Sequence, residues 1–140
     1  MEQAIENDAH CFCCGTENPH GLHLVFSFPE SGGAETALVI PGYFSGWKRM
    51  THGGFLSMLL DEVMAHACIH SAGPDNDRTA VTAEMTVRFK KPVETGTTVR
   101  IAGKLTETKG RILSTQGWLY DESGAVAAEA QARFLVSRQA

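Results

Sequence analysis

The stretch 51-THGGFLSMLLDEVMAHAC-68 decides which fold we expect for this chain. Its apolar residues lie around nearly the whole circumference of a helix, so it predicts a helix that is buried on most sides. The helix should end near Ser71, because residues 71–78, SAGPDNDR, combine glycine, proline and short polar side chains. Asp61 and Glu62 stand in its middle, and an unpaired buried carboxylate is strongly destabilising. Both carboxylates therefore need partners or a chemical use.

The segments outside this helix alternate apolar and polar residues, which is the periodicity of strands. Upstream, 21-GLHLVFSF-28 and 35-ETALVI-40 predict two strands joined as a hairpin. Downstream we expect four longer strands, at residues 80–89, 97–108, 111–122 and 125–137. The last of them is rich in alanine, but its alternation and the preceding Ser-Gly turn favour a strand over a helix. Their short connections imply an antiparallel meander.

These elements predict an α+β fold with one long helix lying against an antiparallel sheet of about six strands. No repeat, low-complexity tract or linker divides the sequence, so we expect a single domain over residues 1–140, with an irregular lead-in at residues 1–20. A helix that is apolar nearly all round is either enclosed by its own sheet or shared with a second subunit.

Composition excludes several classes of function. The 140 residues are 43% apolar and carry a formal net charge of −4, with lysine and arginine scattered singly, so we expect no nucleic-acid partner. No stretch approaches the roughly 18 apolar residues of a membrane span, and no signal peptide is recognisable. We therefore expect a cytoplasmic protein without a membrane partner, and its four cysteines should be free thiols.

The helix opens on His52-Gly53-Gly54. Backbone N–H groups in the first turn of a helix lack intrahelical acceptors, and glycine lets a ligand approach them closely. Together with the helix dipole, they can polarise a carbonyl and hold the negative charge of an acyl-transfer reaction. A carboxylate acting as nucleophile or base would complete such a site. Asp61 lies about 12 Å beyond Gly53 on its own helix, so it would have to come from the partner helix of a symmetric dimer.

A simpler interpretation of the two carboxylates remains open. Asp61 and Glu62 differ by about 100° around the helix axis and cannot share a face. One of them can therefore be solvated, or paired with a basic side chain across an interface.

The segment HGGFLSMLLDE resembles the active-site helix of the hotdog-fold acyl-CoA thioesterases, in the branch similar to phenylacetate-pathway (PaaI-like) thioesterases. The resemblance extends to CFCCGTENPHGLHLVF (residues 11–26), FSGWKRMTHGG (44–54) and AVTAEMTVRFKKPVETG (80–96). It implies a hotdog fold, in which an antiparallel sheet wraps a long central helix.

The resemblance also implies roles for individual residues. Asp61 matches the acidic residue that serves as nucleophile or general base, and His52 matches the histidine beside the thioester. Gly53 and Gly54 match the turn whose backbone N–H polarises the thioester carbonyl. Thr82 matches a hydroxyl position that can orient the attacking water from across the dimer.

These roles predict a homodimer, or a homotetramer built from two dimers, that hydrolyses acyl-CoA to free acid and coenzyme A without metal or cofactor. One position departs from the family pattern, since Ser45 stands where a glutamine or asparagine is frequent, which weakens a contact to the thioester oxygen. Two alternatives remain open: an acyl-CoA binding or sensor module without turnover, and a hydratase or dehydratase of the same fold. The identity of the acyl chain cannot be read from the sequence.

Further residues are candidates for substrate binding. Ser45 is a candidate contact to the substrate, and an acyl pocket can be lined by Phe44, Trp47, Phe55, Met58 and Leu59, although core packing explains most of these apolar residues equally well. Glu62 can shape the pocket or replace Asp61 as the catalytic carboxylate. Glu84 is expected on the same strand face as Thr82, looking into the site.

A basic cluster of Arg88, Lys90 and Lys91 ends the strand at residues 80–89. Such a cluster is usually a solvated edge that discourages pairing with other chains. The resemblance instead implies that it lies near the phosphates of coenzyme A.

Cysteine and histidine residues crowd the first two dozen positions, namely His10, Cys11, Cys13, Cys14, His20 and His23. Cys11 and Cys14 have the spacing of a zinc knuckle, but a closed zinc site needs two more ligands and no second C-x-x-C exists. We therefore expect a thiol-lined loop without metal. Glu62, His66 and His70 share one side of the helix, and one interpretation is that they bind a metal together. We expect instead that the two histidines are structural, because they lie near the helix C-terminus.

Overall fold

The computed structural model describes residues 9–71 and 79–136. Its long helix, α1, spans Gly53–Ser71, and the predicted break after Ser71 lies outside the described residues. The strands are β1 (Ala34–Val39), β2 (Ser45–Trp47), β3 (Met50–Thr51), β4 (Ala80–Phe89), β5 (Thr98–Lys109), β6 (Ile112–Tyr120) and β7 (Val126–Val136), and a short 3-10 helix η1 covers Gly42–Phe44. Within the described residues, no helix is both long and apolar enough to cross a membrane.

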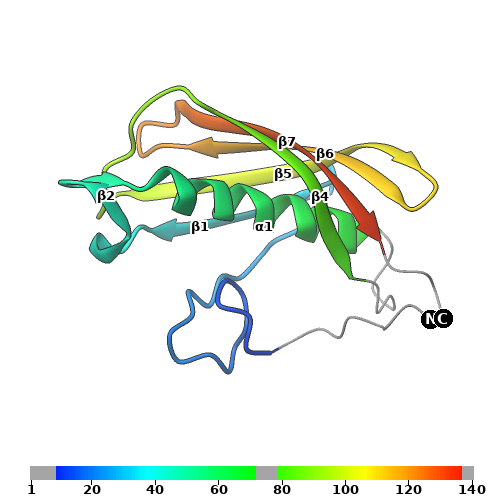
Figure 1. The fold of residues 1–140 in the computed structure, drawn as a ribbon, viewed down its shortest axis with the longest axis horizontal. Coiled ribbons are helices and arrows are strands. Elements are labelled where there is room, and N and C mark those ends of the chain that lie inside the picture. Colours follow the sequence, from blue (N-terminus) through cyan, green and yellow to red (C-terminus); the bar gives the residue numbers. More distant parts are fainter. Residues whose placement is uncertain (1–8, 72–78, 137–140) are drawn as a thin grey trace.

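Five strands form one antiparallel sheet in the order β1-β5-β6-β7-β4, and α1 lies along one face of it (Figure 1). The predicted α+β architecture is thereby confirmed. Of the four strands expected to form a meander, β5, β6 and β7 do so, and their tight turns place Gly110 and Gly124 at positive φ of 63° and 86°. The expectation is wrong for β4, which pairs with β7 and not with β5, its neighbour in the sequence. β1 and β4 are the two edges of the sheet.

The core lies between α1 and the sheet. Leu60, Val63 and Met64 of the helix are fully buried, as are Ile101 and Phe134 of the sheet. Two glycines let the layers approach closely: a Cβ on Gly103 would lie 3.1 Å from the Val63 carbonyl oxygen, and one on Gly117 would lie 3.1 Å from the Met64 side chain, both tight contacts. The helix thus rests directly on the backbone of the central strands.

The predicted strand at residues 21–28 is wrong. Among the described residues, its backbone pairing with β1 is limited to an isolated bridge between Ser27 and Glu35, and the Thr36 hydroxyl also donates to the Val25 carbonyl at 2.8 Å. The reason is that the Leu22 and Leu24 N–H groups donate to the carbonyls of Phe12 and Cys13, at 2.9 Å each. The segment is therefore tied to the N-terminal loop, and the main sheet has five strands, with β2 and β3 forming a separate small hairpin.

Strand β4 contains a bulge, after which successive side chains point to the opposite face of the sheet from the one that strict alternation predicts. Thr82 pairs with the buried Phe134, while Glu84 pairs with Arg133, so the register shifts between Thr82 and Glu84. Phe134 and Arg133 are neighbours on β7 and point to opposite faces. Thr82 therefore faces the helix and Glu84 faces outward, where its carboxylate pairs with the Arg133 guanidinium. The expected shared face of Thr82 and Glu84 is not observed.

Candidate active site

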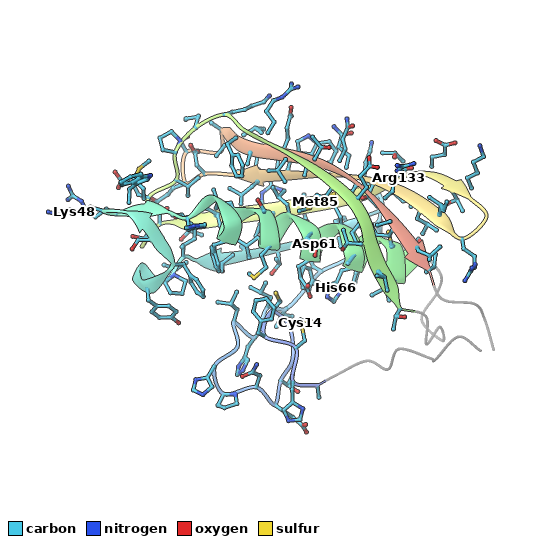
Figure 2. All side chains as sticks on the ribbon, viewed as in Figure 1. Cys14, Lys48, Asp61, His66, Met85 and Arg133 are labelled. Carbon is cyan, nitrogen blue, oxygen red and sulfur yellow. The ribbon has the colours of Figure 1, made fainter. Side chains whose placement is uncertain are left out.

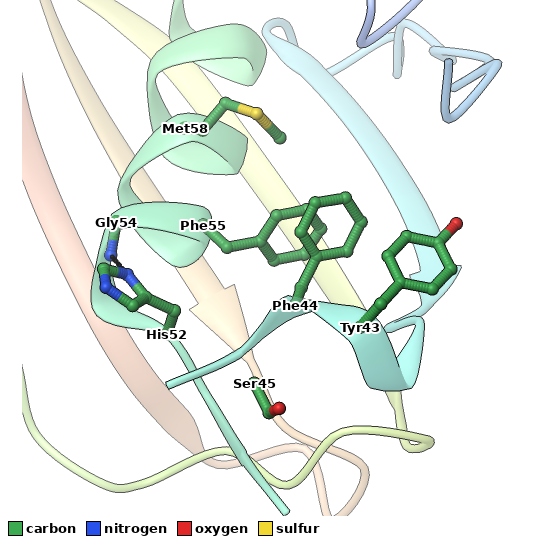
Figure 3. A pocket seen from close by; sticks show the side chains of 7 residues that line it. All are labelled: Tyr43, Phe44, Ser45, His52, Gly54, Phe55 and Met58. Carbon is green, nitrogen blue, oxygen red and sulfur yellow. Dashed lines mark hydrogen bonds between the residues drawn. The ribbon is translucent and has the colours of Figure 1, made fainter. Parts of the chain in front are cut away.

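A hollow of about 360 Å³ opens at the N-terminus of α1 (Figure 3). Its lining comes from the loop before the helix and from the first turns of the helix: Tyr43, Phe44, Ser45, His52, Gly54, Phe55 and Met58. The Phe44 ring stacks on the Phe55 ring, with centroids 3.9 Å apart, and the His52 N–H donates to the Phe44 carbonyl at 2.9 Å. The loop is thereby fixed to the helix start, and the hollow has an apolar wall and a polar end.

Among the residues predicted to bind substrate, Phe44, Ser45, Phe55 and Met58 line this hollow, whereas Trp47 and Leu59 do not. Trp47 lies on β2 with 83% of its surface exposed. Tyr43 is a lining residue that the sequence analysis missed. The only available signal was its position beside Phe44 in the loop that precedes the helix.

His52 caps the helix. Its Nδ1 accepts the Gly54 N–H at 2.8 Å, and its carbonyl oxygen accepts the N–H groups of Phe55 and Leu56 at 3.0 and 3.2 Å. Because Nδ1 is the acceptor, a neutral His52 ring carries its proton on Nε2. A Cβ on Gly54 would approach Nδ1 to 2.9 Å, so glycine makes room for this cap.

The cap changes which donors face a ligand. Sequence reasoning assigned the Gly54 N–H to the thioester carbonyl, but in this arrangement that group is bonded to His52. Within residues 9–71 and 79–136, the Gly53 N–H has no hydrogen-bond partner. The Gly53 N–H and the His52 Nε2–H are therefore the donors available at the positive end of the helix dipole.

Asp61 lies at the middle of α1, where the helix passes β4 (Figure 2). Its Oδ1 accepts the Thr82 hydroxyl at 2.6 Å, within the same chain. Burial raises the pKa of Asp61 above its usual value; the Thr82 hydrogen bond acts in the opposite direction, and the nearby Glu62 charge adds to the rise. The carboxylate is thus half-buried, oriented by one hydroxyl, and more basic than a solvated aspartate.

Within one chain, Asp61 does not reach the helix start. It is absent from the lining of the hollow, and the eight residues from Gly53 to Asp61 span about 12 Å along the axis. Thr82, expected to act from across a dimer, instead contacts the carboxylate of its own chain. The described chain therefore holds the two halves of the predicted site at separate places.

Glu62 faces a different part of the molecule. Its Oε1 lies 3.2 Å from His66 Nε2, and the His66 ring stacks on Phe26 with centroids 3.9 Å apart. Burial acts to raise the pKa of Glu62, but hydrogen bonds from His66 and from the Cys14 and Cys13 thiols outweigh it and lower the pKa. Glu62 is therefore saturated with partners away from both Asp61 and the hollow.

The basic cluster lies at the end of β4 and is paired with carboxylates. Arg88 and Lys90 lie 3.9 and 3.4 Å from Glu129, and Lys91 Nζ donates to Asp121 at 3.0 Å. Arg88 has the longest of these contacts and a side chain that is 77% exposed. A phosphate would have to compete with these acidic partners.

Comparison with known proteins places this arrangement in a family. The sequence pattern of the thioesterase superfamily matches residues 49–128, while a search among curated proteins finds no significant match. Among solved structures, the thioesterase superfamily protein RHA08564 has a TM-score of 0.80 and 23% identity, over 91% of this chain and 60% of its own. A Bacillus halodurans protein solved with CoA has a TM-score of 0.65 and 27% identity, over 74% and 66%. A phenylacetic acid degradation-related protein of Ralstonia eutropha has a TM-score of 0.71 and 23% identity, over 81% and 85%.

The chain thus spans less than two thirds of the length of the first two proteins. The RHA08564 and Ralstonia likenesses concern the fold alone. The superfamily pattern, in contrast, covers more than half of the chain and includes the capped helix start, Asp61 and Thr82. On that match, the chain belongs to the thioesterase superfamily.

Proposed function

We propose that this protein is an acyl-CoA thioesterase, which hydrolyses an acyl-CoA thioester to free acid and coenzyme A. The observation that carries the proposal is the half-buried Asp61 carboxylate, held by the Thr82 hydroxyl beside the edge strand β4. Membership of the superfamily supports the reaction class, and the CoA bound by the Bacillus halodurans protein supports the substrate class.

Asp61 supplies the nucleophilic half of the reaction. Its carboxylate either attacks the thioester carbonyl or removes a proton from a water that attacks it. In both cases the carbon–sulfur bond breaks and the coenzyme A thiolate leaves to take up a proton. When Asp61 is the nucleophile, the product is an acyl anhydride of Asp61, and a water molecule then hydrolyses it to release the acid and restore the carboxylate. The raised pKa of Asp61 makes it a better base, while Thr82 keeps the carboxylate in one orientation.

The capped helix start supplies the electrophilic half. The Gly53 N–H and the His52 Nε2–H stabilise the negative charge that develops on the carbonyl oxygen. The hollow beside them receives the acyl chain or the arm of coenzyme A against Phe44, Phe55 and Met58. Ser45 adds a hydroxyl at the polar end of this hollow.

A second copy of the chain joins the two halves. β4 is an open edge, and it carries exposed Val81 and Phe89 near its two ends. Thr82 marks the Asp61 end of β4, while Phe89 lies against Gly53 at the helix start. Antiparallel pairing of β4 with β4 of a second copy sets each Thr82 end beside a Phe89 end. Asp61 of one subunit then faces His52 of the partner subunit, so the enzyme is a homodimer or a pair of such dimers.

The proposed hydrolysis needs neither metal nor cofactor. In the described part of the chain, Asp61 belongs to no group of side chains with metal-binding spacing. The carboxylate therefore acts through its own charge and basicity. All four cysteines are free, which suits a reducing compartment such as the cytosol.

Arg88 is our candidate for contacting a phosphate of coenzyme A, because its pair with Glu129 is long and exposed. Lys90 and Lys91 have shorter contacts with their carboxylates and contribute less.

The test is a panel of short, medium and aryl acyl-CoA esters incubated with the native chain, with free thiol and all products quantified. A non-hydrolysable thioether analogue of each ester serves as the matched control. We expect one thiol released per acid formed, and none from the thioethers. Saturable binding without thiol release would contradict the proposal in favour of a binding module. Hydration of an enoyl ester without thiol release would contradict it in favour of a hydratase.

A further inference from the structure

Two cysteine thiols and one glutamate carboxylate lie close together between the N-terminal loop and α1. The Sγ atoms of Cys11 and Cys14 and a carboxylate oxygen of Glu62 all lie within 4.8 Å of one another. All three side chains are partly buried. Figure 2 shows Cys14 in the loop below the helix, with His66 and Asp61 labelled on the helix above it.

Backbone hydrogen bonds fix the loop that carries the two cysteines. The Gly15 N–H donates to the Cys11 carbonyl at 2.8 Å, and the Leu24 N–H donates to the Cys13 carbonyl at 2.9 Å. A Cβ on Gly15 would lie 2.3 Å from the Ala9 carbonyl oxygen, so only glycine allows this turn. The loop geometry therefore does not depend on a ligand.

We propose that Cys11, Cys14 and Glu62 bind one zinc ion, with a water molecule as the fourth ligand. Two thiolates and one carboxylate form a donor set that zinc accepts in tetrahedral geometry. With metal–sulfur bonds of about 2.3 Å, tetrahedral ligand atoms lie about 3.8 Å apart, so the cluster must contract by about 1 Å at most. His66 already holds Glu62 by a hydrogen bond at 3.2 Å, in the way that outer partners orient metal-binding carboxylates.

Zinc binding is balanced by proton release. Burial raises the pKa of the Cys14 thiol, and the Glu62 carboxylate beside it raises it further, so without metal this thiol is neutral. Binding converts two thiols to thiolates and frees two protons per zinc. The ion ties the N-terminal loop to the middle of α1.

This site was missed in the sequence because its third ligand is remote. The C-x-x-C spacing was recognised, but Glu62 comes from the long helix and was considered as a pocket residue, as an alternative catalytic carboxylate, or as a metal ligand together with His66 and His70. The site is separate from the proposed hydrolysis, since Asp61 points about 100° away around the helix axis.

The experiment uses the full chain, reduced and stripped of metal with a chelator, and titrated with Zn²⁺ and with Co²⁺. We expect about one equivalent of either ion, a thiolate-to-cobalt charge-transfer band, and two protons released per zinc in weak buffer. Cys11→Ser and Cys14→Ser should each weaken zinc binding by at least about 100-fold, and Glu62→Gln by at least about 10-fold. Loss of a residue that only hydrogen-bonds to a metal ligand typically weakens metal binding by about 10- to 100-fold, so loss of a ligand itself should cost at least as much.

Matched controls remove the same groups elsewhere. Cys68→Ala removes a thiol outside the cluster, and Glu122→Gln neutralises an exposed carboxylate, so neither should alter zinc affinity. If a cysteine variant fails to fold, the proton count and cobalt spectrum of the native chain still decide. Absence of stoichiometric zinc on the reduced native chain would overturn the proposal. Unchanged affinity in folded Cys11→Ser or Cys14→Ser would also overturn it. Neither result bears on thiol release from acyl-CoA.

Discussion

Asp61 and Glu62 are neighbours in the sequence, yet they occupy opposite chemical environments. Asp61 accepts one hydroxyl, from Thr82, and burial raises its pKa. Glu62 accepts hydrogen bonds from His66 and two thiols, which together lower its pKa. The difference follows from about 100° of rotation around one helix, which directs one carboxylate to the edge strand and the other to the N-terminal loop. A carboxylate with spare acceptor capacity is suited to catalysis, and a saturated one to structure or metal binding.

The largest effect is predicted for a variant that disrupts the dimer and thereby separates Asp61 from the helix start of the second subunit. Val81→Glu places a charge on the β4 edge and should convert the dimer to monomers, because the pairing would bury an unpaired carboxylate beside the apolar Phe89 end of the partner strand. Thiol release should fall by about 100-fold or more, since the donors at the helix start are lost to Asp61. Light scattering coupled to gel filtration and steady-state kinetics measure the two effects.

Val39→Glu is the matched control, since Val39 is equally apolar and exposed but lies on β1, the opposite edge of the sheet. It should leave the dimer and the activity intact. If Val39→Glu dissociates the dimer and Val81→Glu does not, the interface lies on β1 and our assignment of it to β4 is wrong.

A smaller effect is predicted for a variant that disturbs only the orientation of the Asp61 carboxylate. Thr82→Val removes the hydroxyl that holds Oδ1 and should lower kcat by about 10-fold, the value of one hydrogen bond to a charged group. Thr82→Ser keeps the hydroxyl and should restore kcat to within about 3-fold of native. If serine fails to rescue a folded protein, the hydroxyl is not what positions the carboxylate.

The smallest effect concerns a third carboxylate, Asp121, in the turn between β6 and β7. Hydrogen bonds from the Ser123 hydroxyl and from Lys91 lower the pKa of Asp121 from 3.8 to about 2. Because the folded pKa lies below the unfolded one, its contribution to stability is present above pH 3.8 and disappears as the pH falls towards about 2.

Asp121→Asn should therefore lower Tm slightly at neutral pH and make no difference near pH 2, as measured by circular dichroism melts across pH. Glu122→Gln serves as the control in the same turn. If the Tm difference between the native chain and Asp121→Asn is the same at every pH, the ionised Asp121 carboxylate does not stabilise the fold and this assignment is contradicted.

The sequence allowed the secondary structure to be predicted wherever periodicity reports burial. The helix was found at the expected place, and β4 to β7 lie within a few residues of their predicted bounds. The alternation at residues 21–28 was misleading, because it reports which side chains are buried and not which backbone groups are partners. The bulge between Thr82 and Glu84 was invisible for a related reason, since one unpaired residue reverses a face without changing the composition of the strand.

The candidate site was predicted by residue type more readily than by contact. His52, Gly54, Ser45 and Phe55 meet at one hollow because they are close in the sequence. The Asp61–Thr82 hydrogen bond and the Cys14–Glu62 contact join segments that are far apart in the chain, and only tertiary packing brings them together. Spacing alone contains no information about such pairs.

The central claim is that Asp61, and not Glu62, performs the hydrolysis. We would measure kcat for thiol release from the best acyl-CoA substrate with the native chain, Asp61→Asn and Glu62→Gln, each confirmed as folded and dimeric. The account predicts a loss of at least about 100-fold for Asp61→Asn and of less than about 10-fold for Glu62→Gln. The reverse order, with the large loss at Glu62, would contradict it.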